Sequence, residues 1–386
     1  MSNKKSGIIR RLGFLAVVVG IGAALSLAGF SPALAKSPKS FKWLLQSCWT
    51  AGDFHQTNPQ NLAKIIEEMS GGRLKINVMA AGAIVPSFEV LDAVNKGIID
   101  AGNSWPGYWM GKHPAAALFS SMVGGPFGLN SEDFLGWVYR GGGLELYNEM
   151  LQKELKLNVI SFPTSGEAPE PQGWFPKPLK SVKDFKGLKF RAAGMSAEVF
   201  KEMGMSVVTL SGGEIVPGLE RGVIDCAEYS DPSSDMRMGF QDVRKYYHMP
   251  GIHQPTGFLE LIINKKKWDA LPADLKAIVK YGVMATGFSF DISMLDKNSE
   301  DLKTLIDKHG VTVVQTPREI MLETLKAWDK VAERQAKKNP FFAKVLESQR
   351  KWAKKVVPYR RVAHPPYDLA ADFYWGDLNP YKVMKP

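Results

Sequence analysis

One local pattern occurs twice in this chain of 386 residues, at residues 89–103 and at residues 214–228. Each copy begins with apolar residues at helical spacing and reaches a glycine, Gly97 or Gly222. Such a glycine suits the left-handed turn that ends a helix, and the two β-branched residues after it predict a short strand. The repetition predicts two similar α/β lobes facing each other across a cleft, an arrangement for enclosing a small ligand. The alternative is that the two segments are similar by chance, because the order helix–glycine–strand is frequent in α/β proteins.

The first 35 residues have the pattern of a secretory signal peptide. Four cations and no acid precede an apolar run over residues 12–30, and Ala33-Leu34-Ala35 forms a small-residue cleavage site. We expect cleavage after Ala35 and export to the periplasm by the Sec route or, given the Arg10-Arg11 pair, by the twin-arginine route. An uncleaved membrane anchor is the alternative, because the apolar run is long enough to span a bilayer. Lipid anchoring is not expected, since Phe30 stands where the lipidated cysteine would be.

Length and charge constrain what remains after the signal segment. About 351 residues are enough for two domains with sizeable cores. The formal charge of +10 falls to +6 when the four signal cations are removed. Residues 318–361 hold 13 Lys and Arg against 5 Asp and Glu, which predicts either solvated helix faces or a contact surface for a partner or a membrane. Nucleic acid is not an expected partner, because the sequence has no compact basic stripe with interleaved aromatic residues.

Cysteine and histidine usage limits redox and metal chemistry. Cys48 and Cys226 are the two cysteines, and we expect two unpaired, buried or partly buried thiols. A disulfide between them is the alternative in an oxidising compartment. The six histidines are scattered, without His-x-x-x-His spacing or a cysteine pair, so a structural zinc site is not expected.

Alternating strand and helix patterns indicate an α/β fold with a hinge. Strand-like runs at residues 159–162 and 259–263 are expected to carry the chain out of the first lobe and back into it, and a hinge requires two such crossings. The helices at the C-terminal end are expected to stop near Val357, and the tail from Pro358 has no clear period. The predicted parts are lobe I at residues 36–160, completed by about 250–270; lobe II at 161–249, completed by about 310–317; a long inter-lobe helix at 271–309; and C-terminal helices and a tail at 318–386.

Arg191 is the first candidate for ligand binding. It ends a predicted strand and precedes Ala192-Ala193-Gly194, so small residues leave space beside its guanidinium. A planar fork of donors at a strand end can hold a carboxylate by two parallel hydrogen bonds. The alternative is an arginine at the surface or in a structural ion pair.

Oxygen-bearing side chains recur in the predicted cleft. Glu228 and Tyr229 end the second copy of the repeated pattern, Glu170 precedes a proline in a constrained loop, and Gln254 stands between a histidine and a proline. Two carboxylates and an amide suit a Na⁺ or Ca²⁺ that also touches the ligand. The alternative is that these loop acids are only solvated.

Aromatic residues could line the cleft as an apolar wall. Trp105, Tyr108, Trp109 and Trp174 are the candidates. Core packing is the alternative for each of them.

The sequence contains no convincing catalytic arrangement. There is no Gly-x-Ser-x-Gly elbow, no phosphate-binding Gly-x-x-x-x-Gly-Lys loop and no Gly-x-Gly-x-x-Gly after a strand. A two-lobed exported chain without catalytic residues is predicted to be a receptor and not an enzyme.

Four motifs lie along the mature chain: Gly173-Trp174-Phe175, Gly187-Leu188-Lys189-Phe190-Arg191, the run from Leu219 to Asp225, and Glu228-Tyr229. At these residues the chain resembles the solute-binding proteins of TRAP transporters, and the resemblance covers nearly the whole mature length. The segments at residues 110–112 and 141–149 are more similar still to the branch that binds 2-oxo acids such as pyruvate. The resemblance implies a two-lobed, periplasmic-binding-protein-like (Venus flytrap) fold that closes on one ligand and docks on a membrane permease driven by an ion gradient.

The resemblance also implies roles for single residues. Arg191 would hold the carboxylate of a small monocarboxylate, a 2-oxo or 2-hydroxy acid. A bridging cation would be bound by Glu170, Glu228, the backbone carbonyl of Tyr229, and Gln254. The branch often has Gln in the place of Glu170 and Trp in the place of Tyr229, so the second acid here would favour Ca²⁺ over Na⁺. The branch can also form homodimers by exchanging a long helix, and residues 318–357 are long and amphipathic enough to do so.

Two alternative functions remain open at this point. One is a binding protein for an ATP-driven importer, which would differ in the membrane subunits it serves. The other is an exported lyase or hydrolase with Glu228 or Glu170 as general base, which would turn over the bound acid instead of releasing it unchanged.

Overall fold

Two β-sheets organise the chain from Phe41 to Pro386, which forms one unit in this computed structural model. The structure describes residues 39–120, 123, 126–376 and 383–385, so the expected signal peptide at residues 1–35 lies outside the described residues. Within the described part of the chain, no helix is both long enough and apolar enough to cross a membrane.

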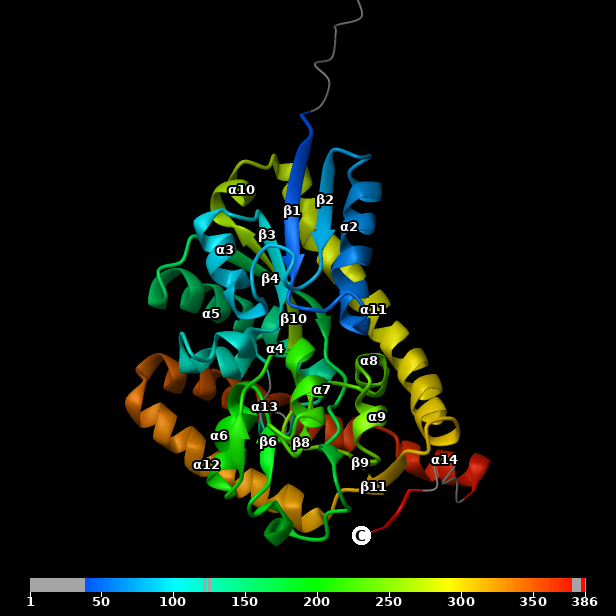
Figure 1. Ribbon diagram of the computed structural model, residues 1–386. Coiled ribbons are helices and arrows are strands. Elements are labelled where there is room, and N and C mark those ends of the chain that lie inside the picture. Colours follow the sequence, from blue (N-terminus) through cyan, green and yellow to red (C-terminus); the bar gives the residue numbers. More distant parts are fainter. Residues whose placement is uncertain (1–38, 121–122, 124–125, 377–382, 386) are drawn as a thin grey trace, which may run out of the picture. The chain divides into compact units, whose positions relative to one another are not determined.

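The first sheet, with the helices on it, forms lobe I and has the strand order β2-β1-β3-β10-β4 (Figure 1). β1 runs parallel to β2 and β3, whereas β10 is antiparallel to β3 and β4. β10 is buried along its whole length, in keeping with its run of aliphatic and aromatic residues. The strands are β1 (Phe41–Ser47), β2 (Leu74–Met79), β3 (Ala101–Ser104), β4 (Val159–Gly166) and β10 (Phe258–Asn264).

The second sheet forms lobe II with its helices and has the strand order β11-β9-β5-β8-β6-β7. β5 is antiparallel to both of its neighbours, β8 and β9, and the other pairs are parallel. The strands are β5 (Gly173–Phe175), β6 (Lys189–Arg191), β7 (Ser206–Val208), β8 (Cys226–Ala227), β9 (Tyr246–Met249) and β11 (Thr312–Gln315). The predicted class of two α/β lobes is therefore what the structure shows.

The repeated pattern forms the same unit in both lobes. In the first copy α3 (Val90–Lys96) is capped by Gly97, and in the second α7 (Gly212–Glu220) is followed two residues later by Gly222. The two glycines have φ angles of 74° and 69°, which are left-handed values that a side chain would strain. Each unit then enters a strand that runs parallel to a neighbour, β3 beside β1 and β8 beside β6.

The strands predicted directly after these glycines are wrong. Ile98 and Val223 are 56% and 48% exposed, whereas Ile99 and Ile224 are buried. The β-branched pair therefore closes the turn, with one side chain in solvent and the next in the core. Strand pairing begins only four residues after each glycine, where a parallel neighbour comes within hydrogen-bonding reach.

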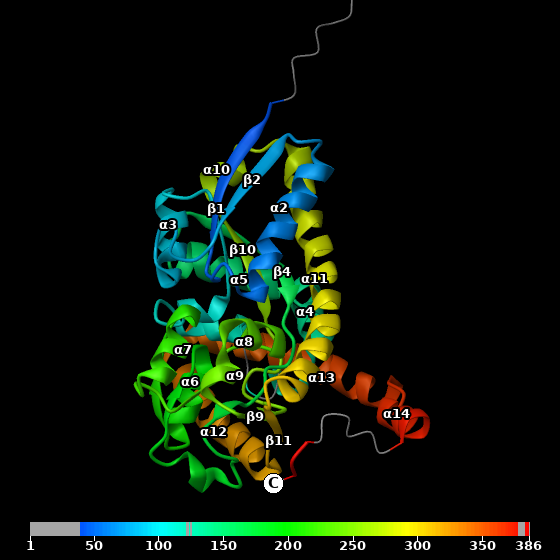
Figure 2. The same cartoon turned by 45° about the vertical axis from the view of Figure 1, so that its right-hand side comes forward.

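Two crossover segments, at residues 167–172 and 250–257, and the long helix α11 (Ala273–Asp307) connect the lobes. The crossover segments run side by side, since Glu170 N donates to Gln254 O at 3.0 Å and Gly251 N donates to Glu170 O at 3.1 Å. α11, yellow in Figures 1 and 2, contacts α2 and β4 of lobe I and α8 of lobe II.

The structural boundaries differ slightly from the predicted ones. β4 continues to Gly166, whereas the sequence placed the end of lobe I at 160, and α11 is two residues shorter at each end than the predicted helix at 271–309. The remaining helical segments are η1 (Phe54–Gln56), α2 (Thr57–Met69), η2 (Ser87–Glu89), η3 (Pro106–Trp109), η4 (Pro114–Phe119), η5 (Pro126–Gly128), α4 (Ser131–Arg140), α5 (Gly143–Glu149), η6 (Met150–Glu154), η7 (Val182–Phe185), α6 (Gly194–Glu202), α8 (Pro232–Met238), α9 (Phe240–Val243) and α10 (Lys265–Asp269).

The C-terminal helices contact both lobes. α12 (Arg318–Lys338) packs on α6, and α13 (Pro340–Ala363) packs on α4 and η4. The predicted helix end near Val357 is wrong, because α13 continues through Pro358 and a further helix, α14 (Tyr367–Trp375), follows. α14, red in Figures 1 and 2, has no buried residue. It therefore lacks the one-sided apolar contact that makes a helix recognisable from its period.

The two cysteines are buried and unpaired, as the sequence predicted. Cys48 follows β1 in lobe I and Cys226 begins β8 in lobe II. Burial raises the pKa of both thiols, so both remain in the weakly reactive thiol form.

Candidate functional site

A small cavity of about 20 Å³ lies between the two lobes, a volume on the order of one water molecule's share. It is reached from the C-terminal ends of parallel strands in both sheets, which is where ligands bind in α/β folds. Lobe I contributes Trp49, His55, Trp105 and Tyr108; the crossover segments contribute Glu167 and Gln254; and lobe II contributes Arg191, Ala193, Glu228, Tyr229 and Ser230.

Arg191 is the last residue of β6, and its side chain is buried. Nε and Nη2 donate to the Leu210 carbonyl at 3.0 and 2.9 Å, and Nη1 donates to the carbonyl and to Oε1 of Glu228 at 2.9 and 3.0 Å. Burial alone would lower the pKa of Arg191, but Glu228 and other neighbours raise it overall, so the guanidinium stays charged. Because a guanidinium has five N–H groups, these four contacts leave one Nη2 N–H for a ligand, not the two parallel ones expected from sequence.

Two buried carboxylates lie together beside this guanidinium. Glu170, Glu228 and His253 each offer one ligand atom, and these atoms lie within 4.8 Å of one another. Within the described part of the chain, neither carboxylate oxygen of Glu170 has a hydrogen-bond partner. Burial, followed by the proximity of Glu228, raises the pKa of Glu170 well above its usual value. Two carboxyl groups in such contact need a proton or a cation between them.

The donor set fits a hard cation. Glu170 and Glu228 supply carboxylate oxygens, Gln254 lies in the cavity wall, and the buried amide of Gln172 has neither side-chain atom hydrogen-bonded among the described residues. Oxygen ligands of this kind suit Na⁺ or Ca²⁺. Such a cation would offset negative charge of the two acids and offer positive charge to an anionic ligand.

His253 is a member of this group that sequence reasoning did not select. Its Nε2 lies 3.2 Å from Oε2 of Glu170, which is an ion-pair distance if the imidazole is charged. Burial lowers the pKa of His253 to about 4. The ring is therefore neutral near pH 7 and does not balance the charge of Glu170.

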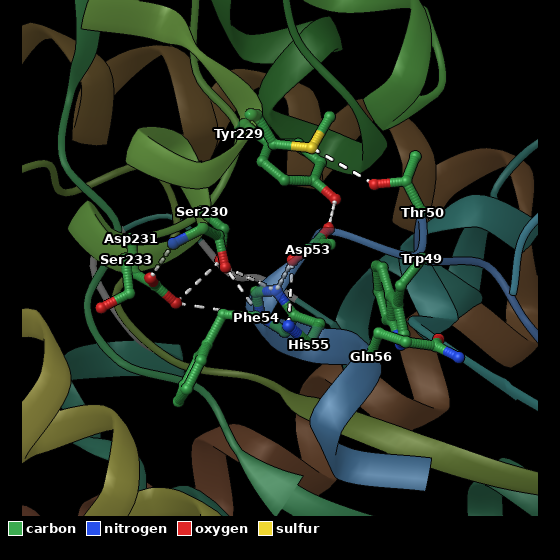
Figure 3. A network of polar contacts seen from close by, with 12 residues as sticks. Trp49, Thr50, Asp53, Phe54, His55, Gln56, Tyr229, Ser230, Asp231 and Ser233 are labelled. Atoms are coloured by element: carbon green, nitrogen blue, oxygen red, sulfur yellow. Dashed lines mark hydrogen bonds and ion pairs between the residues drawn. The ribbon is translucent and has the colours of Figure 1, made fainter. Parts of the chain in front are cut away.

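A polar network joins the two lobes beside the cavity (Figure 3). The Tyr229 hydroxyl in lobe II donates to Asp53 in lobe I. His55 Nδ1 lies 3.1 Å from Asp53 Oδ1 and 2.9 Å from Ser234 Oγ, and its Nε2 lies 3.2 Å from Ser230 Oγ. Burial lowers the pKa of His55, but the surrounding carboxylates, Asp53 foremost, raise it overall to about 9. A charged imidazole is therefore held between the lobes.

The structure brings some of the predicted aromatic residues to the cavity and not others. Trp105 and Tyr108 line it, together with Tyr229. Trp109 is instead buried in lobe I, where its Nε1 donates to Glu260 at 2.7 Å. Trp174 is buried in lobe II, where it donates to a buried aspartate and stacks on a tyrosine ring. The packing alternative therefore describes Trp109 and Trp174.

Several cavity residues were not predicted from the sequence. Trp49 and His55 follow β1, and Glu167 begins the first crossover segment. One available signal was position: Trp49 stands just after a predicted strand, as Trp105 does, and Glu167 lies three residues before Glu170. For Asp53 and His55 the signal was weaker, since Asp53 also serves as an ordinary N-cap for η1.

The sequence matches a known family. A family model described as bacterial extracellular solute-binding protein, family 7, covers residues 46–339. A monocarboxylate 2-oxoacid-binding periplasmic protein from Nostoc sp. is 32% identical over 327 residues, which are 85% of this chain and 88% of that protein.

Solved structures show the same fold. A TRAP transporter solute-binding protein from Bordetella bronchiseptica, a dimer with calcium and picolinate in one active site, has a TM-score of 0.81 and 27% identity, covering 87% of this chain and 97% of its own. One from Pseudoalteromonas atlantica with sodium and pyruvate has a TM-score of 0.79 and 30% identity, covering 87% and 100%. One from Colwellia psychrerythraea with calcium and pyruvate has a TM-score of 0.79 and 29% identity, also covering 87% and 100%.

These findings confirm both the resemblance and the fold class predicted from the sequence. The three structures described above hold small carboxylates together with sodium or calcium. The chain belongs to family 7 of the bacterial extracellular solute-binding proteins, the solute receptors of TRAP transporters.

Proposed function

We propose that this protein binds a small monocarboxylate, a 2-oxo or 2-hydroxy acid, in the cavity between its lobes and passes it to a TRAP permease. One observation carries the proposal: the buried Arg191 guanidinium and the buried Glu228 carboxylate line the cavity, and an oxygen of the buried Glu170 lies within 4.8 Å of one on Glu228. A relative from Nostoc sp. is a 2-oxoacid-binding protein, and two of the similar structures hold pyruvate.

Arg191 and a cation would share the ligand carboxylate. The guanidinium has one N–H left at Nη2, which gives a single charge-assisted hydrogen bond. The second oxygen of the carboxylate would meet a cation held by Glu170, Glu228, Gln254 and the Tyr229 carbonyl. A bound cation supplies positive charge and orientation to the ligand there.

The second acid favours Ca²⁺ over Na⁺. Glu170 and Glu228 together carry two negative charges against the single positive charge of Arg191. A divalent cation and a monocarboxylate bring this group to neutrality, whereas a monovalent cation leaves it negative. In a buried site an unbalanced charge is costly, so we propose Ca²⁺ as the physiological ion.

The protein would act in the periplasm after loss of residues 1–35, and would release its ligand unchanged. This follows from the family, whose members are receptors. Homodimer formation through residues 318–357 stays a proposal. One relative is a dimer, but α12 and α13 pack here on α6 and α4 of their own chain. Analytical ultracentrifugation would test it by comparing the oligomeric state of the mature protein with that of variants at exposed residues of this segment.

A thermal-unfolding scan tests the proposed ligand and ion together. The mature protein is unfolded and refolded to remove carried-over ligand, and single 2-oxo, 2-hydroxy and unsubstituted acids are added with EDTA, Na⁺ or Ca²⁺. A ligand that binds only the folded state raises the midpoint by mass action. We expect the largest rise with a short 2-oxo or 2-hydroxy acid and Ca²⁺, and a loss of that rise with EDTA.

Two results would contradict the proposal. No midpoint rise with any monocarboxylate at millimolar concentration would exclude this ligand class. A change in the added acid, followed by nuclear magnetic resonance over hours, would show an enzyme and not a receptor.

A further inference from the structure

We propose that Trp105 sets the upper size of the ligand side chain, so that the site accepts 2-oxo or 2-hydroxy acids with a short unbranched chain and rejects longer or branched ones. This inference rests on the proposed function and adds to it the residue that decides which acids fit.

The indole of Trp105 spans from one lobe to the other. Trp105 follows β3 in lobe I and lines the cavity. A Cβ added at Gly194, the first residue of α6 in lobe II, would lie 2.7 Å from Cη2 of Trp105. The ring tip therefore rests against a lobe II backbone position where only a glycine fits. Ala193, the residue before Gly194, lines the same cavity.

The indole is held in this position by three further contacts. Its Nε1 donates to Oε2 of Glu167 at 3.0 Å, in the first crossover segment. On its own lobe the ring covers Gly107, where an added Cβ would fall 2.0 Å from Cζ3. The Tyr108 ring meets it edge-on at 5.3 Å. One hydrogen bond and close packing against Gly107 and Gly194 leave the ring little freedom to move aside while the lobes are together.

Two other aromatic walls of the cavity are each fixed by a hydrogen bond of their own. Trp49 Nε1 donates to Asn103 at 2.6 Å, so it is tied within lobe I. Tyr229 donates to Asp53 and serves the polar network between the lobes. A longer ligand side chain must therefore displace Trp105 from Gly194, and lobe closure is then incomplete. Each additional carbon in the ligand side chain should therefore lower the affinity, because it prevents part of the contact between the two lobes.

The test compares chain-length preference in wild type and two Trp105 variants. Kd values are measured for pyruvate, 2-oxobutanoate, 2-oxopentanoate and 4-methyl-2-oxopentanoate with saturating Ca²⁺. We expect wild-type affinity to fall at least tenfold from the shortest to the branched acid. Trp105→Ala should reverse this trend, because the vacated space adds about fourfold per buried methylene. Trp105→Phe, which keeps an aromatic ring, should relax the preference partly and covers the case in which Trp105→Ala folds poorly.

Two controls separate size selection from a structural role. Trp109→Phe removes a buried indole that does not line the cavity, so it should change stability without changing the order of the four acids. Glu167→Ala should relax the preference in the same direction as Trp105→Phe, whereas Glu167→Gln retains an acceptor for the indole and should not.

The outcomes distinguish this inference from the proposed function. If wild type binds the acids and Trp105→Ala weakens all four by the same factor, the size-limit role is excluded while the receptor function stands. If wild type binds none of the four 2-oxo acids and none of the 2-hydroxy acids with the same carbon chains, both are excluded. A reversed or flattened order in the Trp105 variants alone supports the inference.

Discussion

Asp100 in lobe I and Asp225 in lobe II make the same pair of backbone hydrogen bonds. Asp100 Oδ2 accepts from Leu44 N at 2.8 Å, and Asp100 N donates to Leu44 O at 2.9 Å. Asp225 Oδ2 accepts from Lys189 N at 2.9 Å, and Asp225 N donates to Lys189 O at 2.8 Å. Each aspartate thus ties the turn after its helix to a neighbouring parallel strand. The repeated sequence pattern therefore corresponds to a repeated structural unit, and variants at the aspartates and glycines can test what each residue contributes to its stability.

Replacing Asp100 by alanine should lower the free energy of unfolding by about 1–3 kcal/mol, because the Leu44 N–H loses its partner in a partly buried place. Replacing Asp225 should cost less, because the Lys189 N–H that it accepts from is exposed and can bond to water. Asp→Asn keeps an acceptor oxygen and should cost less at both positions. Urea denaturation of the four variants provides the measurement. Equal losses for Asn and Ala would show that charge, such as that between Asp100 and Lys267, matters more than the acceptor.

Alanine at Gly97 or Gly222 should destabilise the protein by roughly 1–2 kcal/mol each, because both φ angles are left-handed. An added Cβ meets nothing closer than 3.7 Å at either position, so the cost is conformational. Gly111→Ala is the matched control, since it also has open space and no left-handed φ. Comparable unfolding free energies for all three variants would contradict the argument.

Arg191→Met should abolish ligand binding and also destabilise the fold by about 3–5 kcal/mol, because it leaves Glu228 buried without its cation. The double variant Arg191→Met/Glu228→Gln should recover much of the stability but none of the binding. Calorimetric titration and denaturation of both variants separate the two effects; ligand affinity surviving in a folded Arg191→Met protein would rule out the carboxylate contact.

His55→Gln should flatten the pH dependence of stability between pH 6.5 and 9. The pKa of His55 is raised to about 9 by carboxylates, of which Asp53, Asp231 and Glu167 face it. A raised histidine pKa stabilises the folded state fully below the unfolded value of about 6.5, and this contribution is lost as pH rises to about 9.

The expected loss in wild type over that interval is on the order of 3 kcal/mol at most, since one pKa unit corresponds to about 1.4 kcal/mol. Denaturant unfolding at pH 6, 7.5 and 9 compares the two proteins. Glu167 titrates in the same interval, with its pKa raised to about 8 by burial, but it remains in both proteins. Parallel pH profiles would mean that His55 is not charged in the closed state.

Local sequence patterns were enough to predict the architecture and the strand-end position of Arg191. Helix, glycine and strand signals act over a few residues, so the repeated pattern at residues 89–103 and 214–228 could be recognised without knowledge of the fold. The position at which strand pairing begins after each glycine could not be predicted in this way. The β-branched pair after each glycine has strand propensity, yet pairing depends on a neighbour that only the folded sheet supplies.

The tail illustrates the same limit. α14 has no buried residue, so no amphipathic period marks it. Its start signal, Pro366 before a first turn that contains Asp368, is common enough to be overlooked.

From the sequence alone followed the two α/β lobes and the family, because strand ends and motif order are local properties. Only the tertiary structure decided which side chains meet. Trp105 reaches the cavity while Trp109 and Trp174 pack elsewhere, and Arg191 has most of its donors engaged by Leu210 and Glu228. The physical reason is that side-chain direction at a cleft depends on packing between segments far apart in the chain, and no local pattern records that packing.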